Sequence, residues 1–276
     1  MILLVTSKKD VASLNIKKQI LRQFAFKKNS QTFQENSTYN ANLKGKDILL
    51  VTLNQESVNA QSLPEYFPNS EIIVFISRHS SASGKPTLSV HTPGNFCEAG
   101  LGGLPKTISV SPAKSMSDAL KALLHFKEYL RLDYEVSYEV THHGPSLDVP
   151  AMFVELGSSE KQWSDPKAAK AVAYSAMHAI INFSKPDSYH SAVLGIGGTH
   201  YNQKFTCMAL VGAAIFGHMI PKHAVCQIDS EMLLQCRTKT FEKVSLAVLD
   251  WKGIKSEDKP KLLSALQDIE LPFKKV

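Results

Sequence analysis

The sequence predicts one α/β domain with a mostly parallel or mixed central sheet and helices on both faces. Short β-branched runs alternate with segments of helical periodicity, and Gly, Pro or Ser residues separate them. An apolar content of 43% in 276 residues is enough for a large core. Because no internal repeat divides the chain, we treat residues 1–276 as one domain. Residues 48–110 could form a mixed-strand region, since several predicted strands follow one another there.

In the first half, an apolar run at 1–6 predicts a strand, and Asp10 can cap a helix that extends to about Phe24. The polar segment 30–42 is rich in Asn, Gln, Ser and Thr, so we expect a surface loop there. Four short runs then predict strands at 48–53, 71–77, 88–91 and 107–110. Apolar residues at helical spacing predict a helix over 115–132.

The second half continues the alternation. Asp165 and Pro166 supply a helix cap and a first-turn proline for a helix that ends near Phe183. The remaining predicted strands are 134–142, 151–156, 191–195, 225–228 and 244–250. The remaining predicted helices are 203–216, 230–237 and 259–269.

Composition restricts the class of protein. Every apolar run is far shorter than the ~20 residues that a membrane-spanning helix needs, and the N-terminus lacks a secretory pattern, so we expect a cytoplasmic protein without membrane contact. The four cysteines form no CxxC pair, which argues against a redox motif. The net charge of +6 favours an anionic partner such as nucleic acid.

Histidines follow several predicted strands, and ligands of open α/β sheets bind at the carboxyl ends of strands. They are His79, His91, the adjacent pair His142 and His143, and His200. Imidazole is the commonest metal ligand, and a catalytic zinc ion takes about three protein ligands. We therefore predict Zn²⁺ as cofactor, with His79, His91 and His142 as ligands and His143 and His200 as catalytic residues.

Glu155 is the predicted catalytic carboxylate. It lies in the otherwise apolar strand 151–156, where an unpaired buried carboxylate would be costly, so we expect a histidine-bound metal or an imidazolium beside it. If the strand 134–142 continues to its end, only one of His142 and His143 faces the site. The other histidines are expected to be structural or on the surface: His125, His178, His190, His218 and His223.

The glycine-rich turn 195–198 lacks the full dinucleotide fingerprint. Its backbone amides at a helix start could still hold a phosphate or an oxyanion. We assign Arg78, Gly197, Gly198 and Thr199 to substrate or phosphate binding. A tight turn that needs glycine for its own geometry is the alternative interpretation.

Four strings occur in order: RHSSASGKPTLSVHTPGN at 78–95, EVTHHGP at 139–145, GIGGTHY at 195–201 and GHMIPKH at 217–223. Together they resemble the archaeal and plant family of D-aminoacyl-tRNA deacylases, and the resemblance extends from Met1 to about Asp250. It implies a zinc-dependent hydrolase with a fold of the phosphorylase and peptidyl-tRNA hydrolase type. The implied reaction cleaves the ester between a D-amino acid and the terminal adenosine of tRNA.

A tRNA substrate would account for the positive charge, and we expect the enzyme to act as a monomer. Two alternatives stay open. A zinc amidohydrolase or peptidase acting on small N-acyl amino acids would use the same histidines and carboxylate, but it would not need a basic surface. A non-enzymatic RNA-binding protein would explain the charge, but it would leave the strand-end histidines without a role, and no recognisable RNA-binding motif is present.

Overall fold

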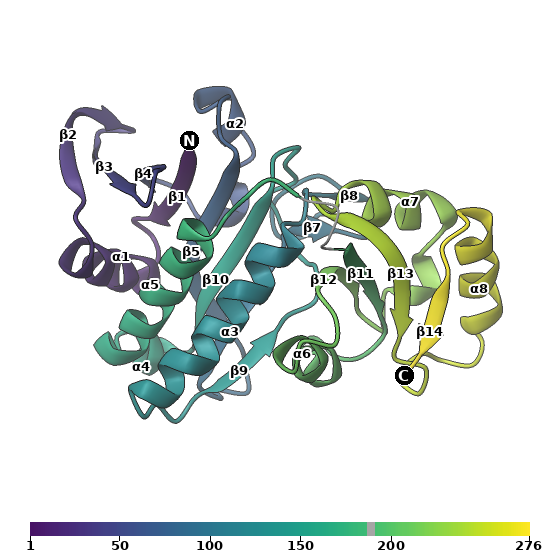
Figure 1. Ribbon diagram of the computed structural model, residues 1–276. Helices are drawn as coiled ribbons and strands as arrows, with labels where there is room; N and C mark the ends of the chain where they lie inside the picture. Colours follow the sequence, from purple (N-terminus) through teal and green to yellow (C-terminus); the bar gives the residue numbers. More distant parts are fainter. Residues whose placement is uncertain (187–190) are drawn as a thin grey trace.

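The computed structural model describes residues 1–186 and 191–276, and two sheets organise it (Figure 1). The larger sheet contains, in spatial order, β2 (Lys27–Phe33), β3 (Asn36–Leu43), β4 (Lys46–Leu53), β1 (Ile2–Ser7), β5 (Ile72–Ser80), β10 (Ala151–Ser158), β6 (Thr87–His91) and β9 (Glu135–Tyr138). Strands β4, β1, β5 and β10 are parallel, whereas β6 is antiparallel to β10. The predicted α/β class with a mixed sheet is confirmed.

The smaller sheet is parallel throughout and comes from the C-terminal part of the chain. Its order is β12 (Phe216–Ile220), β11 (Ser191–Ile196), β13 (Lys243–Leu249) and β14 (Phe273–Lys275). A short antiparallel ribbon, β7 (Gly94–Asn95) and β8 (Thr107–Ile108), lies between the two sheets in Figure 1.

The strands of the larger sheet are apolar on both faces, so each face is covered by a core. Three long helices cover the first face. α1 (Val11–Gln23), α3 (Ala113–Tyr129) and α5 (Pro166–Ile181) pack there, and α4 (Glu160–Trp163) follows β10. In β1, Ile2 and Leu4 join this core, whereas Leu3 and Val5 point into a second core on the opposite face. Leu63 of α2 (Leu63–Tyr66) and Ala60, which follows η1 (Ser57–Asn59), contribute to that second core.

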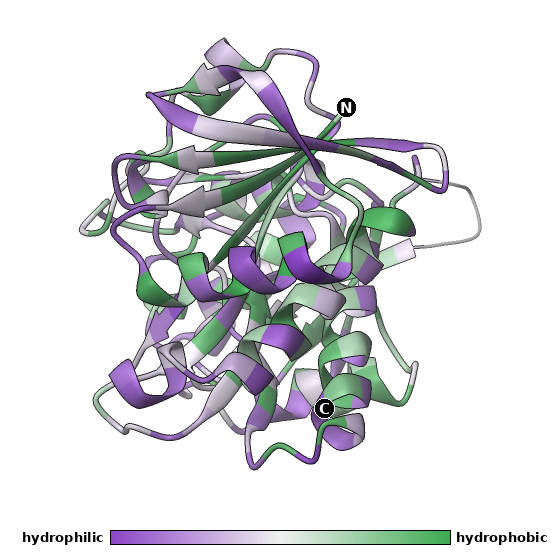
Figure 2. Ribbon diagram, turned by 90° about the vertical axis from the view of Figure 1, so that its left-hand side faces the viewer, coloured by the Kyte–Doolittle hydropathy of each residue, from purple (hydrophilic) through white to green (hydrophobic). Residues whose placement is uncertain are grey.

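The first core continues into the smaller sheet. α6 (Gln203–Leu210) and β12 contribute Phe205, Phe216 and Met219 to it. η2 (Val225–Gln227), α7 (Ser230–Thr238) and α8 (Lys259–Asp268) cover the other face of the smaller sheet. In Figure 2 hydrophobic residues concentrate in the strands, and hydrophilic ones lie along the outward sides of the helices. Among the residues described, no helix is both long and apolar enough to cross a membrane.

The segment 30–42, predicted as a loop, is instead most of the β2–β3 hairpin, so that prediction was wrong. This ribbon lies at the edge of the sheet, and most of β2 is exposed. An exposed edge strand needs no apolar alternation, because backbone hydrogen bonds to its neighbour define it. The polar composition of this segment therefore predicted a loop where the structure has a hairpin.

Two C-terminal predictions were also wrong. The helix predicted over 203–216 ends at Leu210, and Gly212, with φ of +76°, follows directly in the left-handed conformation that commonly terminates helices. Phe216–Ile220 is a buried strand, although only one of its five residues is β-branched. The strand predicted at 225–228 is the single turn η2, which ends at Gln227.

The packing of α3 leads to a stability prediction. Leu120 is fully buried in the first core, and its neighbour Lys121 is exposed on the same helix. We expect Leu120→Ala to lower the free energy of unfolding by about 2–5 kcal/mol, because it removes buried methyl groups and leaves a cavity. Lys121→Ala is the control, with an expected change within about 0.5 kcal/mol. Urea denaturation measures both, and equal small effects would contradict the proposed packing.

Candidate functional site

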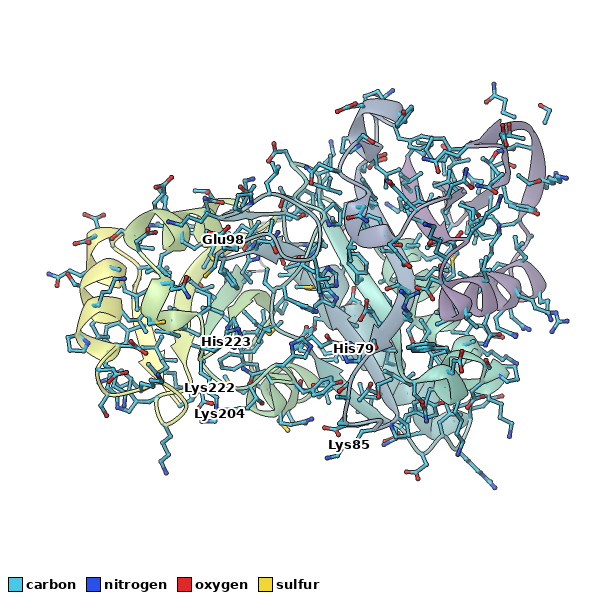
Figure 3. All side chains as sticks on the ribbon, turned by 180° about the vertical axis from the view of Figure 1, so that it is seen from behind. His79, Lys85, Glu98, Lys204, Lys222 and His223 are labelled. Atoms are coloured by element: carbon cyan, nitrogen blue, oxygen red, sulfur yellow. The ribbon has the colours of Figure 1, made fainter. Side chains whose placement is uncertain are left out.

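Seven buried or partly buried side chains meet where the two sheets approach each other. They come from the ends of β5 and β6, from β10, and from the segments after β9 and β11. We call them the histidine cluster: His79, His91, Glu139, His142, His143, Glu155 and His200. The structure thus brings together all five histidines singled out in the sequence. Figure 3 labels His79 at the centre of the face that carries this site.

Three histidines of the cluster present one ring nitrogen each to a common point. Nδ1 of His142 lies 2.8 Å from the carbonyl oxygen of Val140, and Nδ1 of His143 lies 2.7 Å from that of Gly144. Nδ1 of His91 is 3.3 Å from the carbonyl of Thr92. A donor bond from Nδ1 leaves the lone pair on Nε2. One possible ligand atom from each ring lies within 4.8 Å of the other two.

Both adjacent histidines belong to the cluster, so the expectation that only one of them faces the site was wrong. Strand β9 ends at Tyr138, four residues before His142. His143 has a φ of +44°, outside the extended conformation. The alternation of strand side chains therefore no longer applies at these two positions.

Glu139 is a member of the cluster that the sequence reasoning missed. Its side chain has no exposed surface, and Oε2 accepts a hydrogen bond of 2.8 Å from Nε2 of His200. Its other oxygen, Oε1, lies 3.0 Å from Nδ1 of His79. The available signal was a glutamate three residues before a histidine pair, in the string EVTHHGP.

Glu155 has the imidazole neighbours that its burial requires. Oε1 accepts a hydrogen bond of 2.7 Å from the hydroxyl of Ser77, and Oε2 lies 3.4 Å from Nδ1 of His79. Nε2 of His91 lies 3.7 Å from Oε1 of Glu155. Burial would raise the pKa of Glu155, but its contacts with His79 and His91 hold that pKa below the usual range.

The histidines divide into two electrostatic classes. Burial lowers the pKa of His79, but Glu139 and Glu155 outweigh this effect and raise it to about 11. Burial and the neighbouring rings hold the pKa of His142 well below its ordinary value, and burial lowers that of His143 to about 4. His142 and His143 are therefore neutral at pH 7, which is the form that binds metals.

Two pockets open on either side of the cluster, and His142, His143 and His200 line both. The first, of about 470 Å³, is called the acidic pocket. It is lined by Asp10, Glu56, Ser57, Val58, Ser77, Arg78, His79, Ser80, Leu101, Phe153 and Glu155 as well. The second, of about 310 Å³, is called the His223 pocket. It is lined by Gly94, Asn95, Phe96, Cys97, Glu98, Val140, Thr141, Pro221, His223, Ala224 and Gln227 as well.

The residues assigned to substrate or phosphate binding lie close to the cluster, with some of their groups already engaged. Arg78 lines the acidic pocket, and its guanidinium bonds to Glu56 and to the carbonyl of Lys9, each at 3.0 Å. The amide of Gly197 donates to the carbonyl of Ile220 at 2.8 Å. Gly197 and Gly198 have φ of +103° and +84°, so this turn needs glycine for its geometry. Thr199 bonds through its hydroxyl to the carbonyl of Tyr201.

The remaining histidines differ in their surroundings. His218 is fully buried, with Nδ1 3.2 Å from the hydroxyl of Thr141 and Nε2 3.0 Å from the carbonyl of Lys239. These contacts hold Thr141, the residue before His142, in position. His223 is exposed, as expected for a surface residue, and it also lines a pocket. His190 lies outside the described residues.

A family model described as D-aminoacyl-tRNA deacylase matches residues 66–274, which is most of the chain. The chain belongs to the D-aminoacyl-tRNA deacylase family. The deacylases of Pyrococcus horikoshii and Thermococcus kodakarensis are each 35% identical to it, and each match covers 98% of this chain and 98% and 97% of the relative. A crystal structure of a conserved protein of unknown function superposes with a TM-score of 0.87 at 28% identity, over 100% of this chain and 95% of that one.

These deacylases form an enzyme family, so the match favours an enzyme over the non-enzymatic alternative. The identity extends over nearly the whole chain and includes the N-terminal hairpin as well as both sheets.

Gly157 provides a test of the site in this deacylase family member. It pairs with His79 across β10 and β5, and a Cβ at this position would lie 2.8 Å from Cβ of His79 and from the hydroxyl of Thr87. We expect Gly157→Ala to displace the His79 ring and to lower the rate of D-tyrosyl-tRNA hydrolysis by about 100-fold, the cost of a small misplacement.

The matched control is Gly100→Ala, where nothing lies within 4 Å of the added Cβ. Circular dichroism should show both variants folded. Full activity in folded Gly157→Ala would mean that the position of His79 does not matter.

Proposed function

We propose that this protein hydrolyses the ester bond of D-aminoacyl-tRNA, releasing a free D-amino acid and tRNA, with a zinc ion held in the histidine cluster. One observation carries the proposal: three histidines, each with Nδ1 against a backbone carbonyl, converge beside the buried Glu139, which is bonded to His200. The family membership supports the same substrate. The enzyme would act as a monomer in the cytoplasm, where aminoacyl-tRNA is used.

The residues present fit a catalytic zinc ion. His91, His142 and His143 would supply one ring nitrogen each, and Nε2 of His91 is buried without a hydrogen-bond partner. A buried ring nitrogen without a partner is costly unless something else binds it. When bound, zinc would activate water and polarise the ester carbonyl. This ligand set includes His143, which the sequence reasoning had placed among the catalytic residues, and leaves out His79.

His200 is the proposed general base. Glu139 accepts from its Nε2 at 2.8 Å, which holds the ring and directs the basic lone pair to Nδ1. The side chain is 40% exposed and lines both pockets, so water and an ester can reach it. It would take a proton from the attacking water and return it to the ribose oxygen that leaves.

Glu155 remains a proposed catalytic carboxylate, and it lines the acidic pocket. Together with Glu139 it keeps His79 charged, and the hydroxyl of Tyr201 lies 2.5 Å from Nε2 of His79. A positive imidazolium beside the ester would stabilise the negative charge that develops on the carbonyl oxygen. The backbone around Gly198 and Thr199 is the proposed further contact for a phosphate or the oxyanion.

Substrate chirality is the first test. We expect D-tyrosyl-tRNA to be deacylated at least about 100-fold faster than L-tyrosyl-tRNA, because fixed contacts in a shaped pocket reject the mirror image. Release of labelled tyrosine measures both rates. Equal rates would remove the deacylase proposal. Rapid hydrolysis of N-acetyl-D-tyrosine amide, with neither tRNA ester cleaved, would favour the amidohydrolase alternative.

Metal content is the second test. We expect one zinc ion per chain, lost together with activity on chelation and restored by added zinc. His143→Ala should weaken zinc binding by more than about 100-fold, the upper end of what losing an outer hydrogen-bond partner of a ligand costs. His178→Ala, which removes an exposed imidazole on α5, is the control and should bind zinc normally.

The number of ions also tests the role of His200. His79, Glu139 and His200 form a second group whose possible ligand atoms lie within 4.8 Å of one another. A second zinc ion that is lost in His200→Ala would make His200 a ligand and contradict its role as base. Retained zinc with lost activity in His200→Ala would support it.

A further inference from the structure

The histidine cluster separates two pockets of different character, and this arrangement bears on how a substrate lies. His142, His143 and His200 line both pockets, so a bond cleaved at the cluster has space on each side. The volumes of about 470 and 310 Å³ both fall within the range of about 300–1,000 Å³ that small-molecule sites occupy. An aminoacyl ester has two arms, a positively charged amino acid and a nucleoside that continues into a polyanion.

The acidic pocket suits the amino acid. Its lining carries three carboxylates, of Asp10, Glu56 and Glu155, and two cations, the guanidinium of Arg78 beside Glu56 and the imidazolium of His79 beside Glu155. Both oxygens of Asp10 accept from backbone amides, so Glu56 is the carboxylate best able to receive an ammonium group. The apolar part of the lining consists of Val58, Leu101 and Phe153. Leu101 is 67% exposed, so its side chain is accessible to a bound molecule.

The His223 pocket suits a nucleoside. Phe96 forms an aromatic part of its lining, and the exposed side chains of His223 and Gln227 make no hydrogen bond to any other described residue. Imidazole rings stack on bases, and a carboxamide can bond to base edges. Lys222 is exposed beside this pocket, and Figure 3 shows it next to His223 and Lys204 on the C-terminal side of the site.

We infer that the His223 pocket binds the terminal adenosine of tRNA, that Lys222 contacts the phosphates preceding it, and that the acidic pocket holds the D-amino acid with Glu56 on its ammonium group. This inference rests on the proposed function and adds an orientation to it. The polyanion enters from the side of the smaller sheet, and the ester spans the cluster. Opposite placement would put the phosphates beside the three carboxylates of the acidic pocket, whereas the His223 pocket has one, that of Glu98.

Small esters test the two arms separately. D-Tyrosyl-adenosine has both arms, whereas D-tyrosine methyl ester lacks the nucleoside. We expect His223→Ala to raise KM for D-tyrosyl-adenosine by about tenfold, the loss of one stacking contact, and to leave hydrolysis of the methyl ester unchanged. His223→Phe should restore the KM because phenylalanine also stacks. Equal loss on both esters, or no recovery with Phe, would overturn the assignment.

Glu56→Gln is the matched variant in the other pocket. It should raise KM for both esters equally, because each carries the same ammonium group. An effect confined to D-tyrosyl-adenosine would reverse the two pockets and contradict the inference.

Charge reversal tests the path of the tRNA. Lys9 is also exposed and lies beside the acidic pocket, next to Asp10. We expect Lys222→Glu to raise KM for D-tyrosyl-tRNA by about tenfold at low salt, with a smaller effect at high salt, and not to alter the methyl ester. Lys9→Glu should have little effect on either. A larger rise in KM with Lys9→Glu than with Lys222→Glu would place the tRNA beside the acidic pocket and contradict the inference.

A binding experiment separates failure of this inference from failure of the proposed function. Adenosine 5′-monophosphate needs no hydrolysis to be detected by calorimetry. Binding to the wild type that is lost in His223→Ala would support the adenosine pocket even if no ester were cleaved. Binding that is unaffected by His223→Ala would overturn the pocket assignment even if D-tyrosyl-tRNA were hydrolysed.

Discussion

Two carboxylates are buried at the junction of the sheets, and an ionised carboxylate away from water is costly unless cations or donors surround it. Glu139 takes its partners from both sides: His79 belongs to β5 of the larger sheet, and His200 follows β11 of the smaller one. The same contacts that neutralise the charge therefore also join the two sheets. Because each imidazole is held by a carboxylate or a carbonyl, the cluster is ordered before any substrate arrives.

Packing outside the cluster supports this order. Thr141 bonds to the buried His218 and also accepts from the amide of Met219 on β12, so the segment carrying His142 and His143 is anchored to the smaller sheet. On the other side, Gly144 lies so close to Gly102 and Gly103 that an added Cβ would approach the amide of Gly103 to 2.1 Å. The histidine pair is thus held between two backbones. A site built from segments distant in sequence needs such support to keep its geometry.

The sequence could predict part of the site, because side chains that follow strands tend to lie at the ligand-binding edge of a sheet. The carboxyl ends of parallel strands meet at one sheet edge, and this rule applies to His79 at the end of β5. It does not explain His91, which ends the antiparallel strand β6, or His200, which follows a strand of the smaller sheet. Glu139 could not be expected at the site, because the apolar and aromatic run around it suggested a strand continuing to residue 142, whereas the strand ends at Tyr138. The same error assigned His142 and His143 to opposite faces. In the fold, the exposed β2–β3 hairpin was missed for a related reason, since its pairing depends on backbone bonds that leave no apolar pattern.

The geometry also constrains how mirror-image substrates can be distinguished. D- and L-amino acids carry identical groups, so only their arrangement about one carbon differs, and a site must fix three of those groups to tell them apart. The cluster would fix the ester and Glu56 the ammonium group, while Val58, Leu101 and Phe153 offer a surface for the side chain. With ester and ammonium group held, exchanging configuration redirects the side chain away from that surface, toward the position of the hydrogen. Chirality is then selected by which direction the pocket leaves open, without any group that recognises one particular side chain.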